Sequence, residues 1–166
     1  DGGDSWQPAA QMPLPNVVVL AISPAYAADY TLFALQAWGD DGLLYRSTDG
    51  GQTWKPLWRQ SQLRFVVISP DYAKDSTIFA ATNRPTPNLV WVSRDNGDHW
   101  QAITDQTTLP ALSQISGLAI SPAFATDHRL AITGDGAIYL SHDGGHSWQW
   151  SGGHSPHTAV AFAPDI

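Results

Sequence analysis

The chain of 166 residues carries fifteen acidic residues, all aspartate, against eight basic ones, so its net charge is −7, and it has no cysteine. The length allows one domain with a sizeable core, and the sequence has no run of about 18 apolar residues that would span a membrane. The acidic balance argues against nucleic acid as a partner, because binding to a phosphate backbone needs a basic face, and the absence of cysteine excludes disulfides and Cys-based zinc or redox sites.

The start of the chain has no basic, apolar leader, which predicts a mature chain or an excised piece. It reads DGGDSW from Asp1 to Trp6, the tail of a turn that recurs further on. Residues 1–10 are therefore expected to form the last strand of a preceding unit. Gly, Pro, Trp, Thr and Asp are plentiful in the chain, and this composition favours strands and tight turns.

The first complete unit is predicted at residues 17–58. It opens with Val17 to Ile22, a near-continuous apolar run that is typical of a strand buried on both faces. A loop of the pattern Tyr-Ala-x-Asp leads to a second strand, Thr31 to Leu35, and a polar connection leads to a third, Leu43 to Arg46. The sequence STDGGQTW then turns the chain into a fourth strand, Trp54 to Trp58.

The same order of elements returns at residues 63–104 and 115–151, and residues 157–166 are expected to begin a further unit. The later strands are predicted at Phe65 to Ile68, Thr77 to Ala81, Leu89 to Val92 and Trp100 to Ile103, then at Leu118 to Ile120, Leu130 to Thr133, Ala137 to Leu140 and Trp148 to Trp150. Four short strands in about 45 residues leave no room for a helix and are typical of one propeller blade. The sequence thus predicts an all-β fold, a β-propeller of four-stranded antiparallel blades.

The turn before each fourth strand is nearly invariant: STDGGQTW, SRDNGDHW and SHDGGHSW. Its aspartate can accept hydrogen bonds from nearby backbone N–H groups, its glycines permit the positive φ of a tight hairpin, and its tryptophan covers the turn. These properties predict a structural role for the whole set: Ser47, Asp49, Gly51, Thr53 and Trp54; Ser93, Asp95, Gly97 and Trp100; Ser141, Asp143, Gly145, Ser147 and Trp148.

This motif, Ser-x-Asp-x-Gly-x-Ser/Thr-Trp, resembles the Asp-box or BNR repeat of sialidases, sortilin-type receptors, oligoxyloglucan-cleaving hydrolases and a photosystem II assembly factor. The resemblance spans the whole chain. It implies a hairpin between the third and fourth strands of each blade, on the side facing away from the ligand-binding surface. His99 stands in the hydroxyl position of the second box, which predicts that this turn is held less tightly.

The number of units leaves two arrangements open. Propellers usually need four or more blades to close, so three units with two partial ones predict either a segment of a larger propeller or several copies that complete a ring together. An open array would expose unpaired strand edges and apolar faces, which soluble proteins avoid.

Enzymatic hypotheses depend on the acidic residues. Sialidase chemistry, as the resemblance implies it, requires a Tyr–Glu pair, and the chain has no glutamate. A glycoside hydrolase that uses two aspartates remains open, because Asp40 and Asp41 in WGDDG and Asp135 in GDGA lie in equivalent connections, with Trp38 placed to stack on a sugar ring. The alternative is that both connections are ordinary Gly/Asp hairpin turns.

Other repeated or clustered residues receive structural interpretations. In each unit an aromatic residue and an aspartate recur three residues apart, which predicts a loop closed by an Asp cap, with the ring packed on the next blade. These pairs are Tyr26 and Asp29, Tyr72 and Asp75, and Phe124 and Asp127. His142 and His146 flank a glycine hairpin instead of lying on one helix, so no metal site or cofactor is expected. Trp91 is expected in the core, and Trp58 and Trp150 on exposed outer strands.

The least repetitive connection is NRPTPN, residues 83–88, and variable loops on a rigid scaffold commonly carry recognition. The sequence predicts a non-catalytic scaffold that binds a protein or a glycan, extracellular or periplasmic at the cell surface, as in secreted bacterial proteins. The alternatives are part of a glycoside hydrolase whose catalytic residues lie mostly elsewhere, and, by resemblance, an assembly factor for a membrane protein complex. The predicted contact residues are Trp38, Asp40, Asp41, Arg84, Pro85 and Asn88.

Overall fold

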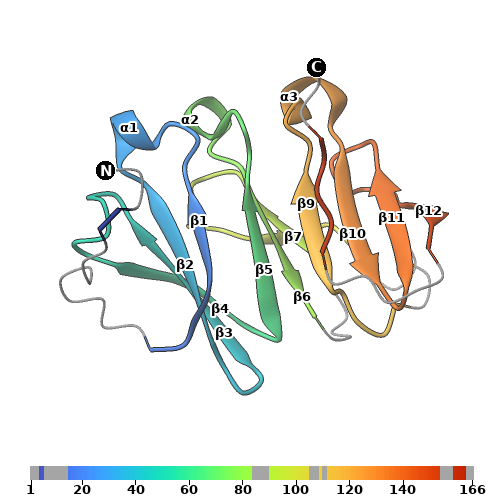
Figure 1. Cartoon of the computed structure of the whole chain (residues 1–166), viewed down its shortest axis with the longest axis horizontal. Coiled ribbons are helices and arrows are strands. Elements are labelled where there is room, and N and C mark those ends of the chain that lie inside the picture. The colour runs from blue at the N-terminus through green and yellow to red at the C-terminus, as the bar shows by residue number, and fades with distance from the viewer. Residues whose placement is uncertain are drawn as a thin grey trace.

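The computed structural model describes residues 4–5, 15–83, 90–104, 109, 112–153 and 159–163. Within these residues twelve strands form three four-stranded antiparallel sheets, each ordered as the chain runs (Figure 1). Blade 1 consists of β1 (Val17–Ile22), β2 (Leu32–Trp38), β3 (Asp41–Ser47) and β4 (Lys55–Ser61); blade 2 of β5 (Leu63–Ile68), β6 (Ile78–Thr82), β7 (Val90–Ser93) and β8 (Gln101–Ala102); blade 3 of β9 (Gly117–Ile120), β10 (Leu130–Gly134), β11 (Ala137–Ser141) and β12 (Gln149–Gly152). The all-β fold of propeller blades is thereby confirmed.

Each blade also contains one helical turn between its first two strands, so the expectation that no helix would fit is wrong. The turns are α1 (Tyr26–Asp29), α2 (Tyr72–Asp75) and α3 (Phe124–Asp127). The residue that follows each turn lies in the left-handed region, with φ between 50° and 52°. Its backbone N–H donates a hydrogen bond to the carbonyl oxygen of the aromatic residue of the turn. A helix of four residues is too short to produce the 3.6-residue periodicity by which a sequence reveals helices.

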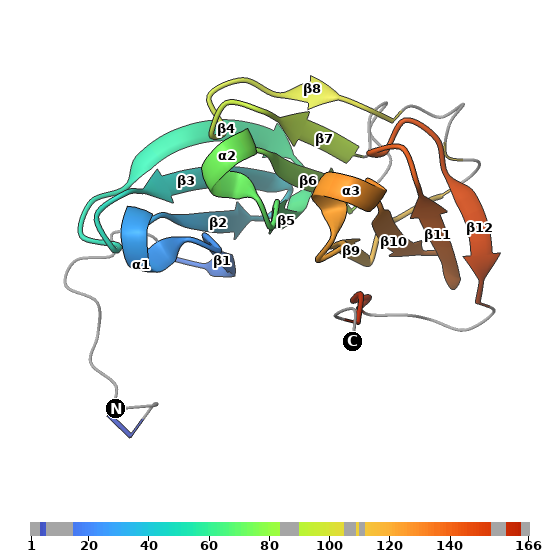
Figure 2. The same cartoon turned by 90° about the horizontal axis from the view of Figure 1, so that it is seen from above.

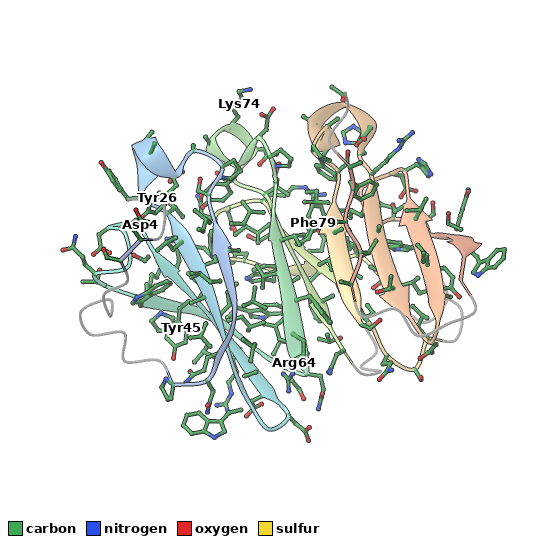
Figure 3. All side chains as sticks on the ribbon, viewed as in Figure 1. Asp4, Tyr26, Tyr45, Arg64, Lys74 and Phe79 are labelled. Carbon is green, nitrogen blue, oxygen red and sulfur yellow. The ribbon has the colours of Figure 1, made fainter. Side chains whose placement is uncertain are left out.

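The blades have distinct edges and ends. The first strands β1, β5 and β9 lie side by side, and β4, β8 and β12 form the opposite edge (Figure 2). At one end, here called the box end, backbone bonds tie each Asp box to the adjacent helical turn, as from Gly50 N to Tyr30 O at 3.0 Å. At the other, the hairpin end, lie the turns that join β2 to β3 and β4 to β5. Figure 3 shows Arg64 at the hairpin end and Tyr26 and Lys74 at the box end.

Two apolar clusters, one between each pair of adjacent blades, form the core. Alternate residues of β6 supply both: Ile78 and Ala80 join the cluster with blade 1, whereas Phe79 joins the cluster with blade 3. Because period-2 alternation places successive side chains on opposite faces, the middle sheet is buried on both sides. This burial explains the near-continuous apolar run of β5, whereas β1, predicted to be buried on both faces, exposes alternate residues.

The recurring aromatic residues of the helical turns pack across these interfaces, toward the preceding blade and not toward the next one. The ring of Tyr72 meets Phe33 edge-on at 5.8 Å, and that of Phe124 meets Phe79 at 5.3 Å. In blade 1 the equivalent Tyr26 instead contacts Tyr30, at 5.9 Å.

The tryptophans outside the boxes differ in their surroundings. Trp58 is half-buried and stacks on Trp100 of blade 2 with ring centroids 4.5 Å apart, so it is not the exposed residue predicted. Trp91 is partly buried and contacts the same ring of Trp58, whereas Trp150 is 58% exposed.

The predicted partial units are only partly described. Of residues 1–10 the structure describes Asp4 and Ser5, which are exposed. Of residues 157–166 it describes 159–163, which have no assigned strand, and Ala159 and Val160 lie against Gly117 of β9. The assignment of both ends to neighbouring units stays a prediction.

Candidate functional site

The Asp boxes are turns closed by their own hydrogen bonds. In the first, Oδ1 of Asp49 accepts hydrogen bonds from Ser47 Oγ at 2.7 Å and Thr53 N at 2.9 Å, and Oδ2 accepts one from Thr53 Oγ1 at 2.6 Å. Ser47 Oγ accepts a bond from Gly51 N at 2.8 Å, and Trp54 Nε1 donates to Gly51 O at 3.1 Å. The side chains of Ser47, Asp49, Thr53 and Trp54 therefore all have hydrogen-bond partners inside the motif.

The other two boxes repeat this arrangement. Asp143 accepts bonds from Ser147 N at 2.9 Å and Ser147 Oγ at 2.5 Å. In the second box, His99 N lies 2.9 Å from Asp95 Oδ1, and His99 Nδ1 lies 2.6 Å from Asp95 Oδ2. The imidazole thus occupies the place of the missing hydroxyl, and the turn keeps the same set of contacts as its two counterparts.

These hydrogen bonds keep the box carboxylates ionised. The side-chain and backbone bonds from Thr53 lower the pKa of Asp49 from 3.8 to about 2, and those of His99 lower the pKa of Asp95 to about 2. Burial raises the pKa of Asp143, but the bonds from Ser147 outweigh it, and its pKa is also about 2. A carboxylate held in this form by its own turn is unsuited to act as a general acid near neutral pH.

The aspartates of the helical turns are also structural. Asp29 Oδ2 accepts a bond from the buried Ser23 Oγ at 2.6 Å, and Asp29 Oδ1 accepts one from Thr31 N at 2.8 Å. Asp75 and Asp127 make equivalent contacts with the serine of their own Ser-Pro sequence. Each loop is therefore closed by an Asp cap.

The residues predicted to contact a ligand in blade 1 gather at the hairpin end. Trp38, at the end of β2, is 63% exposed. Next to it, Arg59 of β4 forms an ion pair with Asp41 of β3. Gln62 Nε2 donates to Asp40 Oδ1 at 2.6 Å. These contacts fix a polar turn beside an exposed indole ring.

A hollow of about 400 Å³ lies at this place, lined by Gln36, Trp38, Asp41, Leu43 and Arg59. It combines an aromatic ring, an aliphatic floor and a paired guanidinium and carboxylate, which is a chemistry suited to a side chain or a ring with polar edges. Sequence reasoning missed Arg59, because its proximity to Asp41 depends on strand register.

The aspartates considered for hydrolase chemistry each bind a neighbouring segment. Asp41 pairs with Arg59, and Asp135 of the β10–β11 turn, at φ 49°, accepts a bond from Ser113 Oγ at 2.6 Å. Asp40 and Asp41 belong to blade 1 and Asp135 to blade 3, with blade 2 between them. Asp40 and Asp135 lie in hairpin turns and Asp41 is the first residue of β3; the choice between hydrolase chemistry and a turn role stays a prediction.

A second hollow, of about 360 Å³, opens at the box end between blades 1 and 2. Its lining includes Arg46, whose Nη1 donates across the interface to Asn96 O at 2.7 Å. Tyr72 also lines it, and burial raises the pKa of Tyr72 to about 12. Arg46 occupies the position of Val92 and Leu140 in the other blades, and this mismatch in the repeat was the available sequence signal.

Three of the predicted contact residues cannot be placed. Arg84, Pro85 and Asn88 fall outside the described residues. Across the described part of the chain, no three His or Asp side chains form a group that could hold a metal ion. In that same part, no helix has both the length and the apolar character needed to cross a membrane.

Comparison with known proteins identifies one matching family and several similar structures. The family described as "Photosynthesis system II assembly factor YCF48" matches residues 33–154, well over half of the chain. No curated protein sequence matches. A chain of the nidogen/laminin complex is similar in structure with a TM-score of 0.71 and 16% identity, over 93% of this chain and 55% of that chain.

Two GH74 structures are also similar. The GH74 xyloglucanase from Xanthomonas campestris has a TM-score of 0.62 and 17% identity, over 86% of this chain and 24% of that one. An ancestral GH74 enzyme has a TM-score of 0.65 and 20% identity, over 92% of this chain and 20% of that one. This chain thus spans about half of the first structure and a quarter or less of the other two, and at these identities the similarity concerns the fold alone.

Proposed function

Because the chain belongs to the family of the photosynthesis system II assembly factor YCF48, we propose that it is a non-catalytic propeller scaffold that binds another protein during the assembly of a membrane protein complex. Binding takes place at the hairpin end, and Trp38 and Arg59 are its principal contacts. The photosystem II named in the family description is the first complex to test.

The observation that carries this proposal is the exposed indole of Trp38 beside the Arg59–Asp41 ion pair. Tryptophan and arginine are enriched among the residues that dominate the energy of protein interfaces. The ion pair and the bond from Gln62 to Asp40 hold the turn in one geometry, so little order has to be gained on binding. At the box end the carboxylates of the three boxes are instead bound within their own turns.

A binding assay with purified photosystem II subunits in detergent tests the proposal. The full chain should bind, and Trp38→Ala should weaken binding by about tenfold or more, as expected for a residue at the centre of an interface. Trp150→Ala is the matched control, because Trp150 is similarly exposed, at 58%, but lies on β12 of blade 3. Its affinity should equal that of the wild type.

Three results would contradict the proposal. Equal affinity of the wild type and the Trp38→Ala variant would remove the hairpin end of blade 1 from the interface. Hydrolysis of xyloglucan by the full chain, lost in Asp41→Asn, would assign the site to a glycoside hydrolase instead. Binding on a glycan array without hydrolysis would replace the protein partner by a sugar. The location outside the cytoplasm is likewise a proposal, and cell fractionation would check it.

A further inference from the structure

The first strand of blade 1 exposes an apolar stripe. Val18, Leu20 and Ile22, here called the β1 stripe, are 54%, 55% and 55% exposed. They alternate along β1 with Val19 and Ala21, which pack against the cluster shared with blade 2. The β1 stripe therefore lies on the sheet face that points away from blade 2. On that face it occupies the inner strand, whereas the Trp38 hollow lies at the hairpin end of β2, β3 and β4.

In the other blades the positions equivalent to Leu20 and Ile22 pack into the cluster shared with the preceding blade. Leu20 corresponds to Val66 in VVISP and to Leu118 in the second LAISP. Val66 is 6% exposed in the cluster with blade 1, and Leu118 is 8% exposed in the cluster with blade 2. Ile68, the counterpart of Ile22, is 9% exposed. The β1 stripe thus has the composition of an interface between blades.

Two contacts recur at both interfaces and describe what the preceding blade supplies. A phenylalanine on its second strand meets the aromatic ring of the helical turn, as Phe33 meets Tyr72. An aliphatic residue on or after its fourth strand lies over the glycine two residues after the aspartate of the box, as Leu57 does over Gly97. At the next interface the corresponding pairs are Phe79 with Phe124 and Ile103 with Gly145.

In blade 1 the two positions that would receive these contacts are Tyr26 and Gly51. Among the described residues, neither has a contact from a preceding blade. The ring of Tyr26 contacts Tyr30 of its own blade. The side-chain space of Gly51 is bordered by Leu32 and Trp54, also of blade 1. Both positions match their counterparts in blades 2 and 3, so the receiving half of the interface is complete.

Blade 3 does not carry the supplying half. Where blades 1 and 2 have Phe33 and Phe79, blade 3 has Ala131, and where they have Leu57 and Ile103, it has Ser151. In addition, Ala159 and Val160 of the same chain lie against Gly117 on β9. A second copy that docked blade 3 onto blade 1 would therefore bring neither the aromatic nor the aliphatic contact.

We propose that the β1 stripe is the docking surface for another four-stranded Asp-box blade, one that presents a phenylalanine on its second strand and a leucine or isoleucine three residues after its box tryptophan. Blade 3 of a second copy is not this blade. The phenylalanine packs on Tyr26 and the aliphatic residue on Gly51. The surface is apolar along β1, so the interaction is driven by burial of apolar area and not by charge.

A tandem protein tests the proposal, because blade 1 itself has both required residues. In this protein residues 15–62 are followed directly by residues 17–166, so the turn through Ser61 and Gln62 joins the copied blade to β1 in the same register in which it joins blade 1 to blade 2. The chain has no cysteine, and Leu20→Cys in the original blade is therefore a clean probe of burial. Val66→Cys gives the rate expected for a position covered by a blade.

In the unextended chain Leu20→Cys should react rapidly with a maleimide, at a rate independent of protein concentration. In the tandem protein the reaction should slow by about tenfold or more and approach the rate of Val66→Cys, since a covered thiol reacts only when the interface opens. The matched control carries Phe33→Ala and Leu57→Ser in the copied blade only, which reproduces the residues of blade 3. Its Leu20→Cys should react about as fast as in the unextended chain.

Three results would overturn the proposal. One is an unchanged labelling rate in a tandem protein whose circular dichroism shows that it is folded. Another is equal protection in the control, which would remove the requirement for the phenylalanine and the leucine. A third is protection of the unextended chain that increases with its concentration, which would make a second copy the occupant. If the tandem protein does not fold, a second version with a four-residue glycine-rich linker in place of Ser61 and Gln62 is subject to the same criteria. None of these readouts involves Trp38 or a photosystem II subunit, so this proposal and the proposed function fail separately.

Discussion

Alanine at the glycine two residues after the aspartate of each Asp box separates strain within the turn from packing between blades. Gly51, Gly97 and Gly145 have φ of +91°, +89° and +95°. An alanine in this left-handed region costs about 1–3 kcal/mol, and the cost should be alike at the three positions because their φ values agree. Any difference in the free energy of unfolding among the three variants therefore reflects the atoms that the added methyl group contacts.

Those neighbours differ between the first box and the others. A Cβ on Gly51 would lie 3.4 Å from Leu32 Cδ1, an ordinary contact within blade 1. A Cβ on Gly97 would lie 2.7 Å from Leu57 Cδ1, and one on Gly145 would lie 2.5 Å from Ile103 Cδ1, both in the preceding blade. Both atoms are the ends of half-buried side chains that can shift, so this overpacking lies at the lower end of the usual range, about 1 kcal/mol. We therefore expect Gly51→Ala to lose about 1–3 kcal/mol and Gly97→Ala to lose about 2–4 kcal/mol.

Urea unfolding followed by circular dichroism measures these free energies, with the slope against urea concentration as a check that the same surface unfolds. Leu57→Ala supplies the control, because it removes the atom that the new methyl group meets. The Gly97→Ala and Leu57→Ala pair should then show a coupling energy of about 1 kcal/mol. Equal losses in Gly51→Ala and Gly97→Ala, or a coupling energy near zero, would refute the assignment of these glycines to the interface between blades.

Three further predictions concern polar contacts. The pKa of Asp143 is lowered in the folded state from 3.8 to about 2, so its contribution to stability is present above pH 3.8 and is lost as the pH falls through about 2. In urea titrations over this pH range, the free energy of unfolding should therefore decline less for Asp143→Asn than for the wild type. His99→Ser should keep the contact with Asp95, whereas His99→Ala should lower the free energy of unfolding by under about 1 kcal/mol, since the pair is exposed. Arg46→Leu should lower the melting temperature, because it leaves Asn96 O without its donor across the blade interface; at a cost of about 1–2 kcal/mol, calorimetry should detect a decrease of a few degrees.

The parts of the fold that could be predicted from the sequence are those determined by local chemistry. Each box is held by contacts between residues two and four positions apart, such as Ser47 with Asp49 and Asp49 with Thr53, so its turn is encoded within eight letters. The three boxes and the Ser-Pro sequences then mark the blades. Features that depend on the neighbouring blade could not be predicted in this way. The contact of Tyr72 with the preceding blade and the stacking of Trp58 on Trp100 both involve residues more than 35 positions apart in the sequence.

The candidate site shows the same limit through strand register. Counted back from the box, Arg46 pairs with Lys55 and Tyr45 with Pro56, and an unbroken ladder would then place Trp58 opposite Leu43. The structure has a bulge between Leu44 and Tyr45, so that Leu44 pairs with Trp58 and Leu43 with Arg59.

A shift of one residue moves every later side chain of β4 to the opposite face of the sheet. It turns Trp58 toward Trp100 in blade 2 and brings Arg59 to the hollow beside Trp38, where it pairs with Asp41. Blade 3 has an equivalent bulge between Ile138 and Tyr139, yet Gly152 occupies the position of Trp58 there. The ion pair of the candidate site therefore depends on a bulge that blades 1 and 3 share and on residues that blade 3 lacks at the same positions. No single motif in the sequence predicts that combination.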